Sequence, residues 1–130
     1  IPNCVFTLKT AAQFHNLTSV IPATIDIALP SDMRNPVLPD YPPVVIYKSI
    51  NKIYKIGMEE IPMRYNCVKM YDRERTVCEF FRMRLQFGED IALEILKNYM
   101  SGTKNIQKLY EYADAIQIKG VIKPYVEALI

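Results

Sequence analysis

The chain is poor in the residues from which most catalytic sites are built. It has one histidine, His15, and no serine lies in a Gly-x-Ser-x-Gly elbow, so a serine–histidine nucleophile is not expected. The three cysteines, Cys4, Cys67 and Cys78, include no Cys-x-x-Cys pair, which argues against zinc. We predict that His15 is a hydrogen-bonded core residue and that the cysteines are free buried thiols of a cytoplasmic protein.

Glycine is also scarce, and the four glycines are spread singly, so no phosphate-binding loop is expected. None of the ten lysines has an acidic residue two positions before it, as the metal site of a restriction-type nuclease would require. We therefore expect no catalytic residues, no metal, no cofactor and no enzymatic activity. The alternative is a nuclease, or an inactive nuclease-like domain, with a restriction-endonuclease-like core.

Long apolar runs and an excess of one charge are lacking as well. The longest stretch without a charged residue, Thr10 to Ile25, has 16 residues and includes Pro22, so we expect no membrane span. Sixteen basic and fourteen acidic residues leave a net charge of +2, which gives no overall nucleic-acid signal. The 130 residues are half hydrophobic, which is typical of one folded domain.

Proline indicates how this domain is organised, because eight of the nine prolines fall at or before Pro62. Since proline is excluded from helix interiors, the first half should form strands and loops. A short helix is expected between an N-cap at Thr7 and a left-handed Asn16, and Asp26 should lie on the water-facing side of a strand. The predicted strands are Thr24 to Leu29, Val44 to Lys48, short pieces within Lys52 to Ile61, and Arg64 to Tyr71.

From Asp72 onward the hydrophobic period changes from two to about 3.6, as in helices. Leu85 is expected in the apolar stripe of the first helix, and Pro124 in the first turn of the last. The sequence thus predicts an α+β domain over residues 1–130, with a small, mostly antiparallel or mixed sheet packed against about four C-terminal helices. The predicted helices are Asp72 to Phe87, Glu89 to Met100, Asn105 to Ile118, and Val121 to Ile130.

Basic side chains are the remaining candidates for a functional contact. Arg75 and Arg82 are seven residues apart, which places them on one helix face with Glu79 between them. Two interpretations are open: the arginines contact a DNA phosphate or a protein partner, or they form ion pairs with Glu79 on a solvated helix surface. Lys119 and Lys123 flank a helix junction, where they contact the same partner or complement a helix C-terminus.

Several pieces of the sequence, spaced along the chain, occur together in a known order. They are His15-Asn16-Leu17-Thr18, Ile21-Pro22, the strand Ile25 to Pro30, Asp72 to Phe81 (DRERTVCEFF), Arg84-Leu85, Gly88 to Glu94 (GEDIALE) and Val121 to Leu129 (VIKPYVEAL). These pieces resemble the C-terminal domain of AbiEi antitoxins, the transcriptional regulators of bacterial type IV toxin–antitoxin (abortive infection) systems. Asn16 stands where glycine is usual in that family and Arg73 where proline is common, and both exchanges are sterically allowed.

The resemblance implies a non-enzymatic domain that supports autorepression of its operon and counteracts a nucleotidyltransferase-type toxin in phage defence. It implies antagonism without a stable complex between antitoxin and toxin. It further implies a winged helix-turn-helix domain upstream of Ile1, which would supply most of the contact with operator DNA. A homodimer is an open possibility, and no membrane partner is expected.

Overall fold

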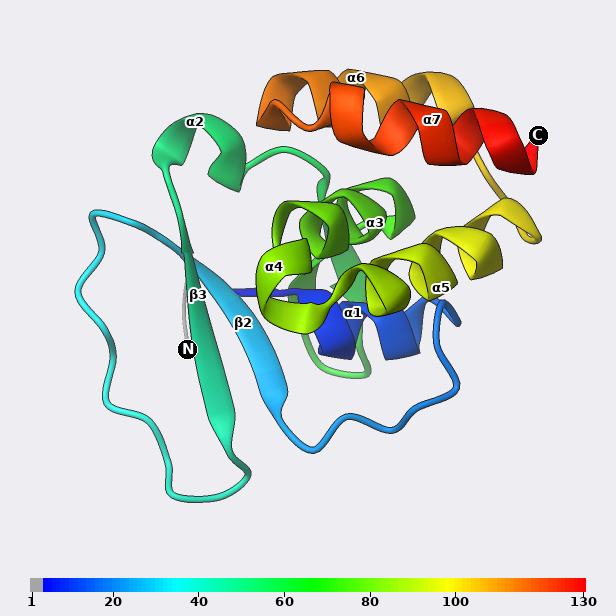
Figure 1. The fold of residues 1–130 in the computed structure, drawn as a ribbon. Coiled ribbons are helices and arrows are strands. Elements are labelled where there is room, and N and C mark those ends of the chain that lie inside the picture. The colour runs from blue at the N-terminus through cyan, green and yellow to red at the C-terminus, as the bar shows by residue number, and fades with distance from the viewer. Residues whose placement is uncertain (1–3) are drawn as a thin grey trace.

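The first half of the chain forms a five-stranded mixed sheet in the order β3-β2-β1-β5-β4 in a computed structural model that describes residues 4–130 (Figure 1). The pairs β2–β3 and β1–β5 are parallel, whereas β1–β2 and β4–β5 are antiparallel. The predicted α+β class is confirmed. The strands are β1 (Val5–Phe6), β2 (Ile25–Pro30), β3 (Val44–Ser49), β4 (Met58–Pro62) and β5 (Cys67–Tyr71).

The central strand β1 was not predicted from the sequence. It has only two residues, which is too short for an alternating pattern to be recognised. Val5 pairs with Ala28, and Phe6 pairs with Ile27 on one side and with Met70 on the other. β1 therefore joins the two halves of the sheet.

The helices of the second half pack around α3, which contacts α1, α5, α6 and α7. In Figure 1, α6 and α7 lie side by side above α3, and α5 lies below them. The buried core between the helices includes Val77, Phe80, Leu96, Leu109 and Ile122. The helices are α1 (Leu8–Phe14), α2 (Asn51–Tyr54), α3 (Arg73–Arg82), α4 (Arg84–Phe87), α5 (Glu89–Met100), α6 (Ile106–Ile116) and α7 (Lys119–Leu129).

The region between β3 and β4 corrects one prediction. Short strand pieces were expected over Lys52 to Ile61, but Asn51–Tyr54 form a helical turn and only Met58–Pro62 form a strand. Gly57 turns the chain between them with φ +76°, and a Cβ there would lie 2.5 Å from the Cβ of Arg75. Glycine is required at this position because it tolerates positive φ and lets the two segments approach closely.

The long helix predicted from Asp72 to Phe87 is interrupted at Met83. After this residue a short turn, α4, continues to Gly88, whose φ is +98°. Leu85, expected in the apolar stripe, is instead 93 % exposed. The interruption turns Phe87 back toward the core, where its ring lies 5.8 Å from that of Phe80.

The last helix begins earlier than expected. Ile118 is buried, and its carbonyl accepts hydrogen bonds from the amides of Val121 and Ile122, so α7 begins at Lys119. Pro124 consequently lies beyond the first turn, where its missing N–H leaves the Gly120 carbonyl without its usual helical partner. Near the start of the chain, directly after α1, Asn16 has φ +59°, which confirms its predicted left-handed conformation.

Asp26 on β2 is fully buried, which corrects the prediction that it faces water. α1 packs against β2 on this side, and Asp26 Oδ2 accepts a 3.1 Å hydrogen bond from the Lys9 amide. The Thr24 hydroxyl donates to Asp26 Oδ1 at 2.9 Å. Burial raises the pKa of Asp26, and the bonds from Thr24 and Lys9 oppose this shift only in part.

Within the described residues, no helix combines the length and the apolar character needed to cross a lipid bilayer.

Candidate functional site

The residues predicted to form a basic contact surface are divided between the interior and the surface. Asp72 caps α3 by accepting a 2.8 Å hydrogen bond from the Arg75 amide, as expected for an N-cap carboxylate. The Arg75 side chain is fully buried. Its Nη1 donates to the carbonyls of Ile53 at 2.5 Å and Ile56 at 2.7 Å, and its guanidinium lies 4.1 Å from the ring centroid of Tyr71.

Glu79 links Arg75 to Arg82. Arg75 Nε donates to Glu79 Oε1 at 3.1 Å, and Arg82 donates through Nε at 2.9 Å and Nη2 at 2.8 Å. Arg75 Nη2 also lies 3.1 Å from Glu79 Oε1 but is not aligned for a hydrogen bond. Burial by itself raises the pKa of Glu79, but the Arg82 hydrogen bonds and the charges of both arginines outweigh it and lower this pKa.

This geometry corrects the interpretation of Arg75 as an exposed residue. Its guanidinium has no access to solvent, so it cannot contact a phosphate or a partner in this fold, and the Arg-Glu-Arg set is not solvated as a whole. The Arg82 side chain is 25 % exposed and is the part of this set that reaches the surface. Its function as a contact residue stays a prediction.

Lys119 and Lys123 lie on α7 and are exposed. The ammonium of Lys119 lies 5.9 Å from the ring centroid of Tyr110, and that of Lys123 lies 3.8 Å from Glu127 Oε1. These exposed interactions are weak, so both side chains remain available to a partner.

A second polar cluster, missed in the sequence, connects the start of α3 to α5 and α6. The ammonium of Lys108 lies 3.0 Å from Asp72 Oδ2 and 3.4 Å from Glu74 Oε1. Glu74 accepts a 2.5 Å bond from the Tyr99 hydroxyl, and Asp72 accepts one of 2.8 Å from Tyr112. Burial, and then the neighbouring carboxylates, raise the pKa of both tyrosines, so the phenols stay protonated and donate hydrogen bonds.

His15 is hydrogen-bonded, as predicted, but it is half-buried at the end of α1 and is not a core residue. Its Nε2 lies 2.8 Å from the Tyr71 carbonyl, to which it donates. Of the cysteines, Cys78 is buried, but Cys67 is exposed and Cys4 is half-buried, so the prediction of buried thiols is correct for Cys78 alone. Among the described residues, no group of three or more His, Cys, Asp or Glu side chains is arranged to hold a metal ion.

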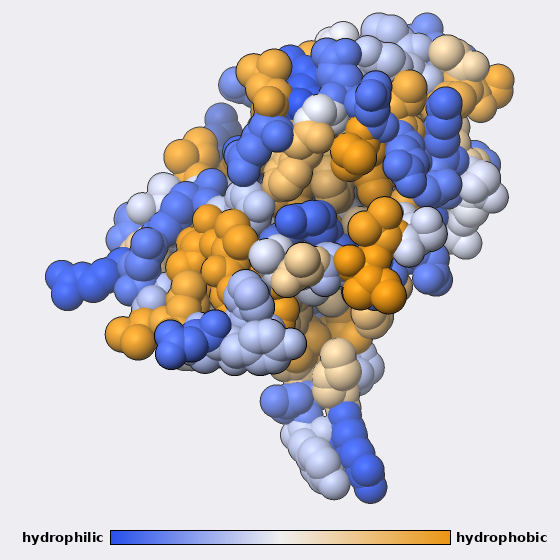
Figure 2. Space-filling model, turned by 60° about the horizontal axis from the view of Figure 1, so that its bottom comes forward, coloured by the Kyte–Doolittle hydropathy of each residue, from blue (hydrophilic) through white to orange (hydrophobic). Residues whose placement is uncertain are grey.

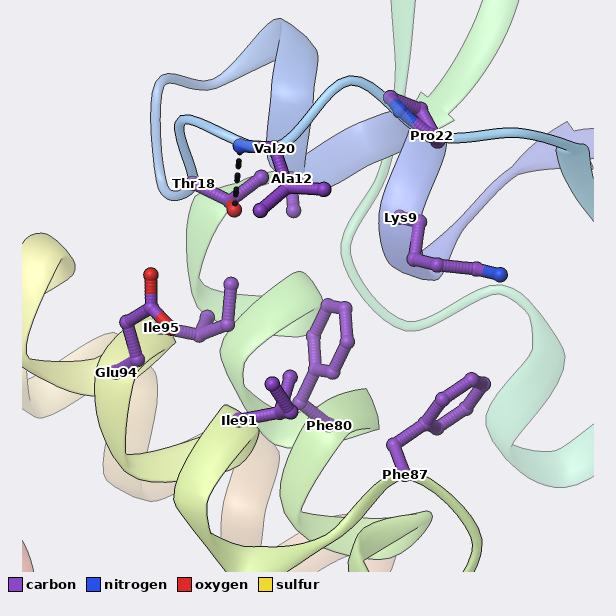
Figure 3. Close-up of a pocket in the computed structure, with 10 residues that line it drawn as sticks. All are labelled: Lys9, Ala12, Thr18, Val20, Pro22, Phe80, Phe87, Ile91, Glu94 and Ile95. Atoms are coloured by element: carbon purple, nitrogen blue, oxygen red, sulfur yellow. Dashed lines mark hydrogen bonds between the residues drawn. The ribbon is translucent and has the colours of Figure 1, made fainter.

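A small apolar pocket lies between α1, the loop that follows it, and α3 to α5 (Figure 3). Its volume is about 160 Å³. The face of the molecule in Figure 2 shows separate hydrophobic areas between hydrophilic side chains. The residues that line the pocket are Lys9, Ala12, Thr18, Val20, Pro22, Phe80, Phe87, Ile91, Glu94 and Ile95.

Sequence reasoning missed this pocket because its walls come from separate segments. The one local signal is the apolar pair Val20 and Ile21, which are 65 % and 79 % exposed in a loop. Exposed apolar residues mark a surface for interaction only where they form a large contiguous patch, and two neighbouring residues do not reveal one. They do not show that α4 and α5 complete a cavity beside them.

No protein-family model matches this chain, and a search of curated proteins found no match either. The resemblance to AbiEi antitoxins therefore stays a prediction from the sequence.

Proposed function

We propose that this chain is the effector domain of an AbiEi-type antitoxin, a non-enzymatic regulator that counteracts a nucleotidyltransferase toxin. In the intact regulator the domain supports autorepression, while an upstream winged helix-turn-helix domain binds operator DNA. The observation that carries the proposal is the ordered resemblance of Asp72–Phe81, Gly88–Glu94 and Val121–Leu129 to that family.

The arrangement of these three runs supports the proposal. They form α3, the first half of α5 and almost all of α7, and the three helices contact one another. Runs that are separated in the sequence thus contribute to one packed unit. This is expected when a family pattern reflects a shared core.

The hydrogen bonds of the polar residues within Asp72–Phe81 also support a non-enzymatic function. Asp72, Glu74, Arg75 and Glu79 are nearly or fully buried, and they bond to backbone groups, to one another and to side chains of α5 and α6. Their hydrogen-bonding groups therefore stabilise α3 and its neighbours. Arg82, Lys119 and Lys123 are the predicted contact residues that remain accessible.

Coexpression tests the proposal directly. The proposal predicts that a nucleotidyltransferase-like protein is encoded directly after the gene of this chain. The chain would be produced together with that protein, in cells whose growth the protein arrests. We expect growth to be restored, while Arg75→Ala, which removes a buried charge from the core, should fail to restore it. Immunoblots of the soluble fraction would measure how much of each antitoxin variant is present. Persistent growth arrest with abundant soluble wild-type chain would overturn the proposal.

A further inference from the structure

We propose that the apolar pocket between α1, α4 and α5 binds a small apolar carboxylate of about the size of benzoate. The ring would occupy the pocket, and the carboxylate would face the Lys9 ammonium. This inference goes beyond the antitoxin function and does not depend on it.

The interior of the pocket is suited to an apolar group. Its floor is formed by Ala12, Phe80 and Ile95, which are 0 %, 1 % and 2 % exposed. The volume of about 160 Å³ is close to that of engineered apolar cavities of ~150 Å³ that bind benzene. Water in such a site finds few hydrogen-bond partners, so its displacement by an apolar ring is favourable.

The charges at the two ends of the pocket favour a carboxylate with one orientation. In Figure 3, Lys9 extends between Pro22 and the Phe87 ring at one end, and Glu94 lies at the opposite end. Lys9 Nζ is 5.8 Å from the Phe87 ring centroid. A bound carboxylate is attracted to the Lys9 end and repelled from the Glu94 end.

The Lys9 ammonium is available for this contact. Among residues 4–130, no carboxylate forms an ion pair with Lys9 within 4.0 Å. Asp26 accepts hydrogen bonds from the Lys9 backbone amide and the Thr24 hydroxyl, and the Lys9 ammonium acts on this carboxylate only through its charge. Replacement of the Lys9 side chain therefore leaves the hydrogen bonds between α1 and β2 intact.

Titration with benzoate and with its neutral isostere benzamide tests the proposal. Chemical shifts in ¹H–¹⁵N correlation spectra should change saturably at Ala12, Phe80 and Ile95. For a ligand of nine heavy atoms we expect a Kd of about 1 mM. An exposed ion pair is worth up to about 1 kcal/mol, so benzoate should bind about threefold to fivefold more tightly than benzamide.

Two charge variants separate the effect of Lys9 from general electrostatics. Lys9→Gln should reduce benzoate affinity to that of benzamide, with benzamide affinity unchanged. Glu94→Gln changes the charge at the other end of the same pocket and should leave the preference for benzoate at least as large. Equal binding of the two probes by the wild type, or an unchanged preference in Lys9→Gln, would overturn the carboxylate assignment.

A steric pair of variants tests the location. Ile91 is 41 % exposed, so Ile91→Trp can be accommodated at the pocket wall and should lower affinity for both probes at least fivefold. Ile50→Trp places the same ring at a 57 % exposed site outside the pocket and should change neither affinity. Absence of saturable shifts at the pocket up to 20 mM of either probe (about twenty times the expected Kd), or binding unaffected by Ile91→Trp, would refute the site.

Discussion

At the scale of single residues, Arg75 shows how burial changes the function of a charged side chain. Its guanidinium hydrogen-bonds to Glu79 and to the carbonyls of Ile53 and Ile56. The last two belong to the segment that ends at Gly57, where only glycine permits the close approach to α3. One buried cation thus connects α3 to the α2 region of the chain.

Replacement of Arg75 should be strongly destabilising. Arg75→Met removes the buried charge and the hydrogen bonds that Arg75 donates to the carbonyls of Ile53 and Ile56 and to Glu79, so that only Arg82 still binds the Glu79 carboxylate. Loss of one member of a buried ion pair typically costs about 3–5 kcal/mol. We expect a decrease of this size in the free energy of unfolding, which urea denaturation would measure. Arg34→Met, at an exposed loop position, is the matched control and should change this free energy by less than about 0.5 kcal/mol. A similarly small effect of Arg75→Met would show that the buried network is not stabilising.

At the scale of secondary-structure elements, the junction of α3 and α4 shows why the apolar pattern misled the sequence analysis. Phe80, Phe81 and Leu85 have helical spacing, but Met83 interrupts the helix before Leu85. Leu85 is consequently turned to solvent, while Phe87 packs near Tyr47, with ring centroids 6.0 Å apart. A pattern in the sequence cannot reveal such an interruption when the next residues are also good helix formers.

A matched pair of leucine substitutions tests this interruption. Leu96 on α5 is fully buried, whereas Leu85 is 93 % exposed. Leu96→Ala should lower the free energy of unfolding by about 2–5 kcal/mol because it creates a cavity. Leu85→Ala should change it by less than about 0.5 kcal/mol. Equal losses in the two variants, measured by chemical denaturation, would indicate a continuous helix with Leu85 in the core.

At the scale of the whole molecule, two buried carboxylates give the stability opposite dependences on pH. The pKa of Glu79 lies below its ordinary value of 4.5, so its contribution is present above that value and is lost as pH falls through the lowered pKa. The pKa of Asp26 lies above its ordinary value of 3.8. Its contribution is therefore present below pH 3.8 and is lost as pH rises through the raised pKa.

These signs predict opposite behaviour for two amide variants. Between pH 7 and pH 3, the free energy of unfolding of Glu79→Gln should decrease less than that of the wild type, because the variant lacks the carboxylate whose protonation destabilises the fold. The free energy of unfolding of Asp26→Asn should decrease more than that of the wild type over the same range, because the variant lacks the stabilisation that protonation of Asp26 provides at low pH. Urea unfolding at several pH values measures how the free energy of unfolding of each variant depends on pH. Parallel pH profiles for the two variants and the wild type would contradict the assigned shifts.

Much of the fold follows from local patterns in the sequence. The bounds of α5, the N-cap at Asp72 and the left-handed Asn16 were predicted because each depends on residues a few positions apart. The same is true of the strands around Ile25–Pro30 and Val44–Ser49. The candidate contact residues were predicted less well. Arg75 was expected to be exposed, but its exposure depends on segments that are remote in the sequence.

The sequence by itself determined the α+β class, most of the helices and the family resemblance, since apolar periodicity and capping residues act within one or two turns of chain. Only the tertiary structure decided that Arg75 and Asp26 are buried, that Leu85 is exposed and that an apolar pocket opens beside Lys9. These features arise where α1, the α2 region and α4 meet the rest of the molecule. Burial depends on which surfaces meet in three dimensions, and that information is not local in the chain.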